Sequence, residues 1–104
     1  MPLPNLNRKE IVAEIFNQTG YNQKEVQDVV ELTLDTIVKA LTQGRSVELR
    51  RFGVFALQKR KPRIGRNPKQ PDQQVPIPAR AVVKFKIGKE LQEGLRKLNP
   101  AVLD

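Results

Sequence analysis

Apolar side chains recur every three to four residues in two stretches of the first 44 residues. This spacing predicts two amphipathic helices. Each helix opens with a capping box, Asn7-Arg8-Lys9-Glu10 in the first and Asn22-Gln23-Lys24-Glu25 in the second. Gly20 and Gly44 are placed to end the two helices. The apolar positions are Ile11, Val12, Ile15 and Phe16 in the first, and Val26, Val29, Val30, Thr33, Leu34, Ile37, Val38 and Leu41 in the second.

After the second helix the pattern changes to alternation, which predicts β-strands. Residues 47–49 fit a half-buried strand, residues 50–53 fit a tight turn, and a second strand begins at 54–57. Residues 82–87 supply a third strand, and residues 88–98 a short helix with leucines at i, i+4 and i+7. The expected fold class is α+β, with two N-terminal helices, a three-stranded antiparallel sheet and a C-terminal helix.

A long polar segment, residues 57–80, separates the second strand from the third. It holds five of the eight prolines, seven of the nineteen Lys and Arg residues, and one acid, Asp72. Its few large apolar side chains cannot bury it in a core of its own, and strand-like sequence flanks it on both sides. We therefore predict a protruding β-ribbon, called the arm below, with Arg66-Asn67-Pro68 near its tip. A cationic two-stranded ribbon fits a polyanionic groove.

Charge is divided unevenly between the two halves of the chain. Residues 1–44 carry four basic and six acidic side chains, and residues 45–104 carry fifteen and five, for a total of +8. The calculated pI is about 10.2. Charge concentrated in one half indicates a binding face rather than general solubility, and its sign favours a nucleic acid as partner.

The composition also argues against several other functions. The chain has no cysteine and no histidine, so it lacks thiolate metal ligands, disulfides and the commonest general base. Its helical carboxylates have the spacing of a solvent face. We expect no catalytic residue, metal, cofactor or small-molecule substrate. The N-terminus has no signal-peptide core, and no apolar run is long enough for a membrane span, so we expect a cytoplasmic protein with no membrane partner.

We expect residues 1–104 to form one domain. Residues 7–44 would be its helical dimerisation part, residues 45–87 the sheet with the arm at about 57–80, and residues 88–98 the C-terminal helix. Outside the arm roughly 80 residues remain, and a chain that small buries only ~60% of its unfolded surface. The second helix has two adjacent apolar stripes, more than one short helix can cover. Together these features predict an intertwined homodimer with two symmetric arms.

Four segments resemble the bacterial histone-like HU/integration host factor (IHF) family in order and spacing. They are Arg51–Phe55, Arg63–Lys69, Ile77–Ala79 and Phe85–Lys89. The similarity extends over residues 7–98. It implies the IHF-like DNA-binding fold of a dimeric, nucleoid-associated protein whose arms lie in the minor groove of double-stranded DNA and bend it, a mechanism for which this family is itself a standard example. The sequence departs from the family at Arg51, where glycine is usual, and at Gln70-Pro71, which replaces Thr-Gly.

The resemblance also assigns roles to individual residues. Pro68 would be the wedge inserted between base pairs, whereas by itself an Asn-Pro pair is an ordinary hairpin turn. Arg60, Arg63 and Arg66 would line the minor groove, although a single strand arginine is ordinarily solvated. The full set of expected DNA contacts is Arg50, Arg51, Lys59, Arg60, Lys61, Arg63, Arg66, Asn67, Pro68, Lys69, Arg80, Lys84, Lys86 and Lys89.

Two alternatives share the basic arm. One is a sequence-specific regulator like integration host factor, which could pair with a paralogous subunit. The other is an RNA-binding module in which Phe52, Phe55 and Phe85 stack on bases. These phenylalanines alternate with small apolar residues, which favours a role in the core. Competition between DNA sequences separates the regulator from a general nucleoid protein, and equal affinity for duplex RNA would indicate the RNA-binding module.

Overall fold

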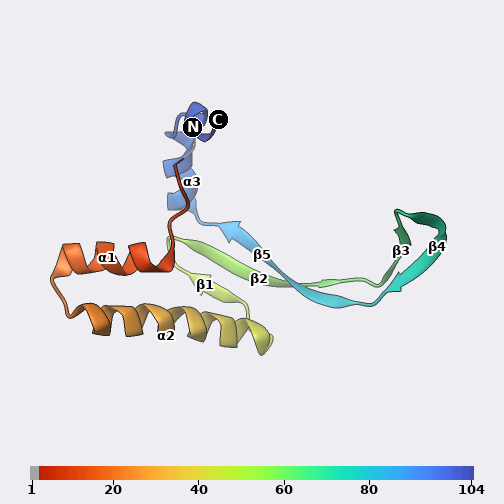
Figure 1. The fold of residues 1–104 in the computed structure, drawn as a ribbon, viewed down its shortest axis with the longest axis horizontal. Coiled ribbons are helices and arrows are strands. Elements are labelled where there is room, and N and C mark those ends of the chain that lie inside the picture. Colours follow the sequence, from red (N-terminus) through yellow and green to blue (C-terminus); the bar gives the residue numbers. More distant parts are fainter. Residues whose placement is uncertain (1–2) are drawn as a thin grey trace.

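The computed structural model describes residues 3–104, apart from the side chains of Asn67 and Pro71. The chain is elongated, with principal extents of 60 × 38 × 28 Å. Helices and a small sheet lie at one end, and a bent β-ribbon reaches to the other (Figure 1). The elements are α1 (Arg8–Thr19), α2 (Gln23–Thr42), β1 (Val47–Leu49), β2 (Gly53–Arg60), β3 (Arg63–Asn67), β4 (Gln70–Ile77), β5 (Arg80–Ile87), α3 (Lys89–Arg96) and a 3-10 turn, η1 (Pro100–Leu103).

Both N-terminal helices begin where their capping residues predict. The Asn7 side chain accepts a hydrogen bond from the Glu10 backbone N–H at 2.9 Å, and Asn22 accepts one from Glu25 at 3.1 Å. Each bond satisfies a backbone donor that the first turn of a helix leaves unpaired. Gly20 ends α1 in the left-handed conformation, with φ 70°, which a residue without Cβ adopts readily. The two predicted helices are therefore confirmed.

The single chain buries very little of its apolar surface. Val12 of α1 and Val26 of α2 are 5% and 6% exposed and form the buried core of the helical hairpin. Further along α2, Val29, Leu32 and Val38 are 61%, 63% and 57% exposed. A soluble monomer rarely leaves a wide apolar face open along a helix. At about 100° per residue, Val29 and Leu32 lie on one flank of α2 and Val38 lies on the other. The sequence predicts Val29 and Val38 as part of its broad apolar face, but not Leu32.

The three-stranded sheet has the order β1-β2-β5 and is antiparallel throughout. Its register sets Val47 opposite Phe55, and Phe55 opposite Phe85. Opposite residues share a face and neighbours along a strand alternate, so one face is apolar. On the other face Lys84 and Lys86 pair with small apolar residues of β2. The predicted three-stranded sheet is confirmed, with its two faces chemically different.

Phe52, Phe55 and Phe85 form an aromatic cluster on the apolar side of the sheet. Their ring centroids lie 5.0–6.3 Å apart in tilted arrangements, which are favourable for aromatic pairs. The Phe85 ring lies so close to Gly53 that a Cβ there would be 2.7 Å from it and 2.6 Å from the Lys86 carbonyl oxygen. Glycine is therefore required between the two phenylalanines Phe52 and Phe55.

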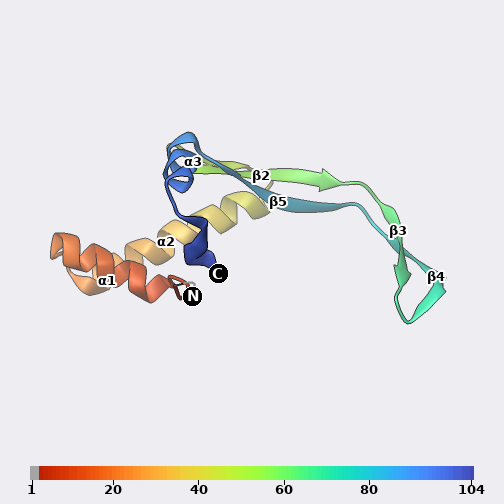
Figure 2. The same ribbon diagram turned by 90° about the horizontal axis from the view of Figure 1, so that it is seen from above.

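The arm consists of two parts rather than one continuous ribbon. Strand pairing ends at the pair Arg60–Arg80 and resumes at Arg63–Ile77, where β3 and β4 form a separate two-stranded sheet, here called the tip ribbon. Pro62 and Pro78 lie in this gap, and neither has an N–H to donate to a ladder. Figure 2 shows the tip ribbon turned away from the direction of β2 and β5. The sequence predicts the protruding arm correctly but not this division.

The C-terminal region differs slightly from the sequence prediction. α3 ends at Arg96, two residues before the predicted limit of 98. A short 3-10 turn follows, in which the Asn99 side chain accepts a hydrogen bond from the Ala101 backbone N–H at 3.0 Å. Pro100 occupies its first turn, where a missing N–H costs nothing. The sequence analysis assigned no structure to this segment.

Candidate nucleic-acid interface

The basic side chains of the arm point into solvent. Within residues 57–80 the only acid is Asp72, and the seven Lys and Arg residues there are all exposed. The candidates outside the arm are exposed as well, namely Arg50, Arg51, Lys84, Lys86 and Lys89. Asn67 is also a candidate, but its side chain lies outside the described part of the structure. The cations are thus accessible to a large polyanion.

Strand register gathers four of these cations on the polar face of the main sheet. Lys84 and Lys86 are two residues apart in β5, so their side chains lie on the same face. Toward the arm, Arg80 lies on this face as well, directly opposite Arg60 of β2. Like charges directly opposite each other destabilise a strand pair. An anion bound across the pair would remove that cost. Register also places the acid Glu48 of β1 on this face, opposite Val54.

The tip ribbon places its two arginines on opposite faces. Arg63 lies opposite Ile77, whereas Arg66 lies opposite Gln74, and the odd difference in their numbers puts their side chains on different sides. Ile77 lies over Gly65, where a Cβ would be 2.9 Å from its Cδ1 atom. A ribbon of this kind inserted in a groove presents one arginine to each wall. Pro68 is exposed in the turn between β3 and β4.

A strained turn connects β1 to β2 beside the start of α3. The Phe52 N–H donates to the Leu49 carbonyl at 3.0 Å, which makes Arg51 the third residue of a β-turn. Arg51 has φ 74°, a left-handed conformation that costs a non-glycine residue roughly 1–2 kcal/mol. The Gly88 N–H donates to the Phe52 carbonyl at 2.9 Å and holds this turn against the start of α3.

One ion pair spans this junction. The Arg51 Nε atom lies 3.5 Å from Glu90 Oε1, and the two side chains are 72% and 62% exposed. An ion pair this exposed contributes about 0–1 kcal/mol to stability. The sequence analysis did not identify Glu90 as part of the site, because only the fold brings α3 next to the turn.

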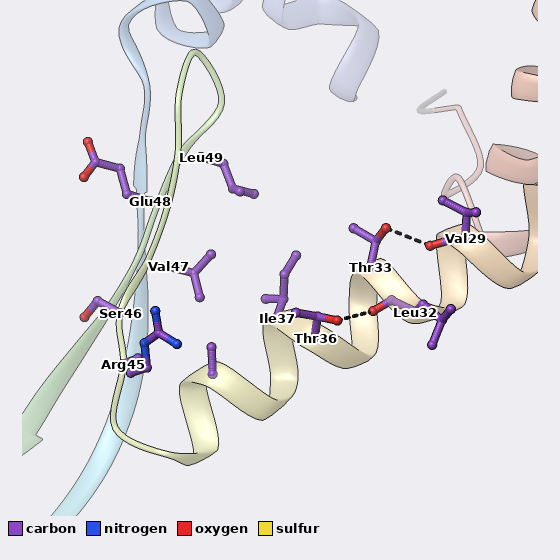
Figure 3. A pocket seen from close by; sticks show the side chains of 11 residues that line it. Val29, Leu32, Thr33, Thr36, Ile37, Arg45, Ser46, Val47, Glu48 and Leu49 are labelled. Atoms are coloured by element: carbon purple, nitrogen blue, oxygen red, sulfur yellow. Dashed lines mark hydrogen bonds between the residues drawn. The ribbon is translucent and has the colours of Figure 1, made fainter.

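A different kind of surface lies between α2 and β1. Here an open groove of about 630 Å³ is lined mainly by apolar residues. In Figure 3, Val47 and Leu49 point toward Ile37 across the groove, and Glu48 points away from it. The groove has the wrong chemistry for a nucleic acid. It suits an apolar protein surface.

Residues 3–104 contain no grouping of carboxylates that could hold a metal ion. In the same part of the chain, no helix combines the length and the hydropathy that crossing a membrane requires.

Comparison with known proteins defines the family. Residues 6–96 match the family described as "Bacterial DNA-binding protein". The chain belongs to this family. Curated relatives include integration host factor subunit alpha from Stenotrophomonas maltophilia (strain K279a) and from Xanthomonas campestris pv. campestris (strain B100). Each is 40% identical over 88 residues, which is 85% of this chain and 88% of the relative.

Solved structures support the same assignment. An Anabaena HU–DNA cocrystal structure is similar at a TM-score of 0.78 and 33% identity, covering 89% of this chain and all of that one. An HU mutant from Thermotoga maritima is similar at a TM-score of 0.60 and 27% identity, and the match covers 86% of this chain and 99% of that one. The resemblance to the HU/IHF family and the α+β fold with its β-arm are confirmed. The chain is a DNA-binding protein of the HU/IHF family.

The structure divides the candidate residues into two groups. Arg50, Arg51 and Lys89 meet where the β1–β2 turn contacts α3, and Lys84 and Lys86 extend from there along the sheet. The tip-ribbon residues lie at the far end of the arm (Figure 1). The residues that sequence reasoning missed are Glu90 and the two prolines in the gap between the ribbons, Pro62 and Pro78. The sequence contains no clear signal for these two prolines, because a proline is compatible with an edge strand and Pro76 is itself paired with Ile64 in β4.

Proposed function

We propose that two copies of this chain form a homodimer that binds the minor groove of double-stranded DNA with its two arms and bends the duplex, largely without sequence specificity. The observation that carries this proposal is the exposed basic arm with opposed cations at Arg60 and Arg80 on a member of a DNA-binding family. We further propose that the protein acts in the cytoplasm on the nucleoid, as a structural protein rather than an enzyme.

The dimer follows from the unburied surface. In the single chain the exposed residues Val29 and Leu32 of α2 and the groove against β1 form an open apolar region, and the rings of Phe52 and Phe85 are half-exposed. A second copy related by a two-fold axis presents the same region and can bury all of it. The relatives are named integration host factor subunit alpha, which indicates an assembly of subunits and is compatible with either an identical or a paralogous partner. Residues 7–44 would then supply the dimerisation helices of a single-domain chain.

We assign the two parts of the arm different roles. Arg63 and Arg66 of the tip ribbon would face the two walls of the minor groove, where negative potential is strong. Arg60, Lys59, Lys61, Lys69 and Arg80 would follow the phosphates along the arm. Pro68 would insert between base pairs, since its ring is apolar and has no N–H left without a partner. Asn67 would contact DNA beside it.

At the base of the arm the ligand would be the sugar–phosphate backbone. Lys84, Lys86 and Lys89 and the turn residues Arg50 and Arg51 form a basic strip from the sheet to the start of α3. Contacts of this kind position a duplex without reading its sequence, and they weaken as salt rises.

A sequence-specific role is the second candidate, because the curated relatives at 40% identity are named integration host factor subunit alpha. Under this alternative the chain could pair with a paralogous subunit. A gel-shift competition distinguishes the two. Labelled random, nicked and A·T-rich duplexes are challenged with unlabelled sequences at fixed salt. A flat profile supports the general protein, and large discrimination for one site supports the regulator.

The same assay tests DNA binding itself. The proposed function predicts binding to duplex DNA that weakens when Arg63 and Arg66 are both replaced by alanine. Equal affinity for duplex RNA would favour the RNA-binding module instead, and undiminished binding by the double variant would remove the tip ribbon from the interface.

A further inference from the structure

We propose that Glu90 masks Arg51 in the free protein and that Arg51 leaves Glu90 for a DNA phosphate on binding, so that Glu90 limits the affinity for DNA. This inference rests on the proposed function. It adds an acidic residue to an interface that otherwise consists of cations, and it assigns that residue a role.

The backbone at Arg51 is the first observation. Its φ of 74° is a conformation that side chains other than glycine adopt at a cost. The Arg51–Glu90 ion pair is too exposed to offset that cost. Within the described part of the structure, this weak ion pair is the only side-chain interaction of Arg51. A residue that is held in a strained conformation and has so little to stabilise it indicates a ligand that the free protein does not contain.

The geometry of the pair is the second observation. The Nε atom of Arg51 lies 3.5 Å from Glu90 Oε1, a long contact for an ion pair, and a guanidinium carries five N–H donors in all. The remaining donors match the bidentate geometry that arginine adopts with phosphate. Both side chains are largely in solvent, so the exchange requires no rearrangement of a buried group.

The surrounding charge is the third observation. Arg50 precedes Arg51 in the turn, Lys89 precedes Glu90 in α3, and both are exposed. The Gly88–Phe52 backbone hydrogen bond keeps the two elements together. Glu90 is therefore an acid that lies among three cations at this junction, and a phosphate that binds Arg51 has to compete with its carboxylate.

The test is a double-mutant cycle read by DNA affinity. We expect Glu90→Gln to tighten binding to linear duplex DNA two- to fivefold at about 0.05 M salt, with the gain shrinking as salt screens the charges. We expect Arg51→Gly to raise the melting temperature by about 2–5 °C while weakening binding several-fold and lowering the salt slope by about 0.9. In the Arg51→Gly background, Glu90→Gln should change the affinity by less than 1.5-fold.

Glu93→Gln is the matched control, since it removes the same charge from an exposed position of the same helix. It should have a smaller effect than Glu90→Gln, and that effect should be equal in both backgrounds. A gain from Glu90→Gln that persists without Arg51 would overturn the proposal, because Glu90 would then act only through its general field. No gain in the parent would also overturn it. Absence of DNA binding by the parent would overturn the proposed function as well, which distinguishes the two failures.

Discussion

The clearest consequence of the open apolar face is the effect of truncating Leu32 in α2. This side chain is 63% exposed in the single chain and lines the groove against β1. Full burial of a leucine side chain is worth about 1.5–3 kcal/mol. If a second copy buries the exposed fraction, Leu32→Ala removes about 1–2 kcal/mol from each subunit and about 2–4 kcal/mol from a symmetric dimer. Because about 1.4 kcal/mol corresponds to a tenfold change in a dissociation constant, the dissociation constant of the dimer should rise roughly 30- to 700-fold.

Ile64 supplies a matched control for this experiment. It is a large aliphatic residue, 65% exposed in the single chain, but it lies in the tip ribbon far from the helices. Ile64→Ala should leave the dimer dissociation constant unchanged. Sedimentation velocity over a dilution series measures both variants. Equal effects of the two substitutions, or a parent chain that is a stable folded monomer at micromolar concentration, would refute the reasoning.

Three further outcomes follow from the structure. Pro68→Ala should leave the melting temperature nearly unchanged and should weaken binding to linear DNA more than binding to nicked DNA, because unstacking a base step costs a few kcal/mol, which contacts of the proline ring offset. If gel shifts show equal effects on the two duplexes, Pro68 is only a turn residue. If about 6–10 phosphates are neutralised, log K should fall with log salt at a slope of roughly −5 to −9, and a slope near zero would place the charge elsewhere. Gly53→Ala should destabilise the fold by about 2–4 kcal/mol in a urea melt, because its Cβ would meet the Lys86 carbonyl oxygen at 2.6 Å, and a neutral result would contradict the packing against Phe85.

Local signals explain which parts of the fold the sequence predicts. Asn7 and Asn22 act within their own first turns, and their caps are found where the sequence puts them. The strands follow from alternation, and the arm follows from a segment that cannot bury itself. Each of these features depends on neighbours in the chain.

The features that the sequence does not predict depend on residues that only the fold brings together. The division of the arm arises because strand pairing sets Pro62 near Pro78, and each proline alone is compatible with a continuous edge strand. The ion pair between Arg51 and Glu90 exists because the Gly88 N–H bonds the Phe52 carbonyl. Opposite faces for Arg63 and Arg66 follow from register. The expected DNA contacts at all these positions stay predictions.

DNA bending by the arms is the central claim, and fluorescence energy transfer between the two ends of a short duplex tests it most directly. We predict that transfer rises as protein is added and saturates together with binding measured by anisotropy on the same sample. A variant with alanine at Arg60, Arg63 and Arg66 should bind weakly and produce little rise. Saturated binding of the parent protein with unchanged transfer would contradict the account, because the arms would then hold the duplex without bending it.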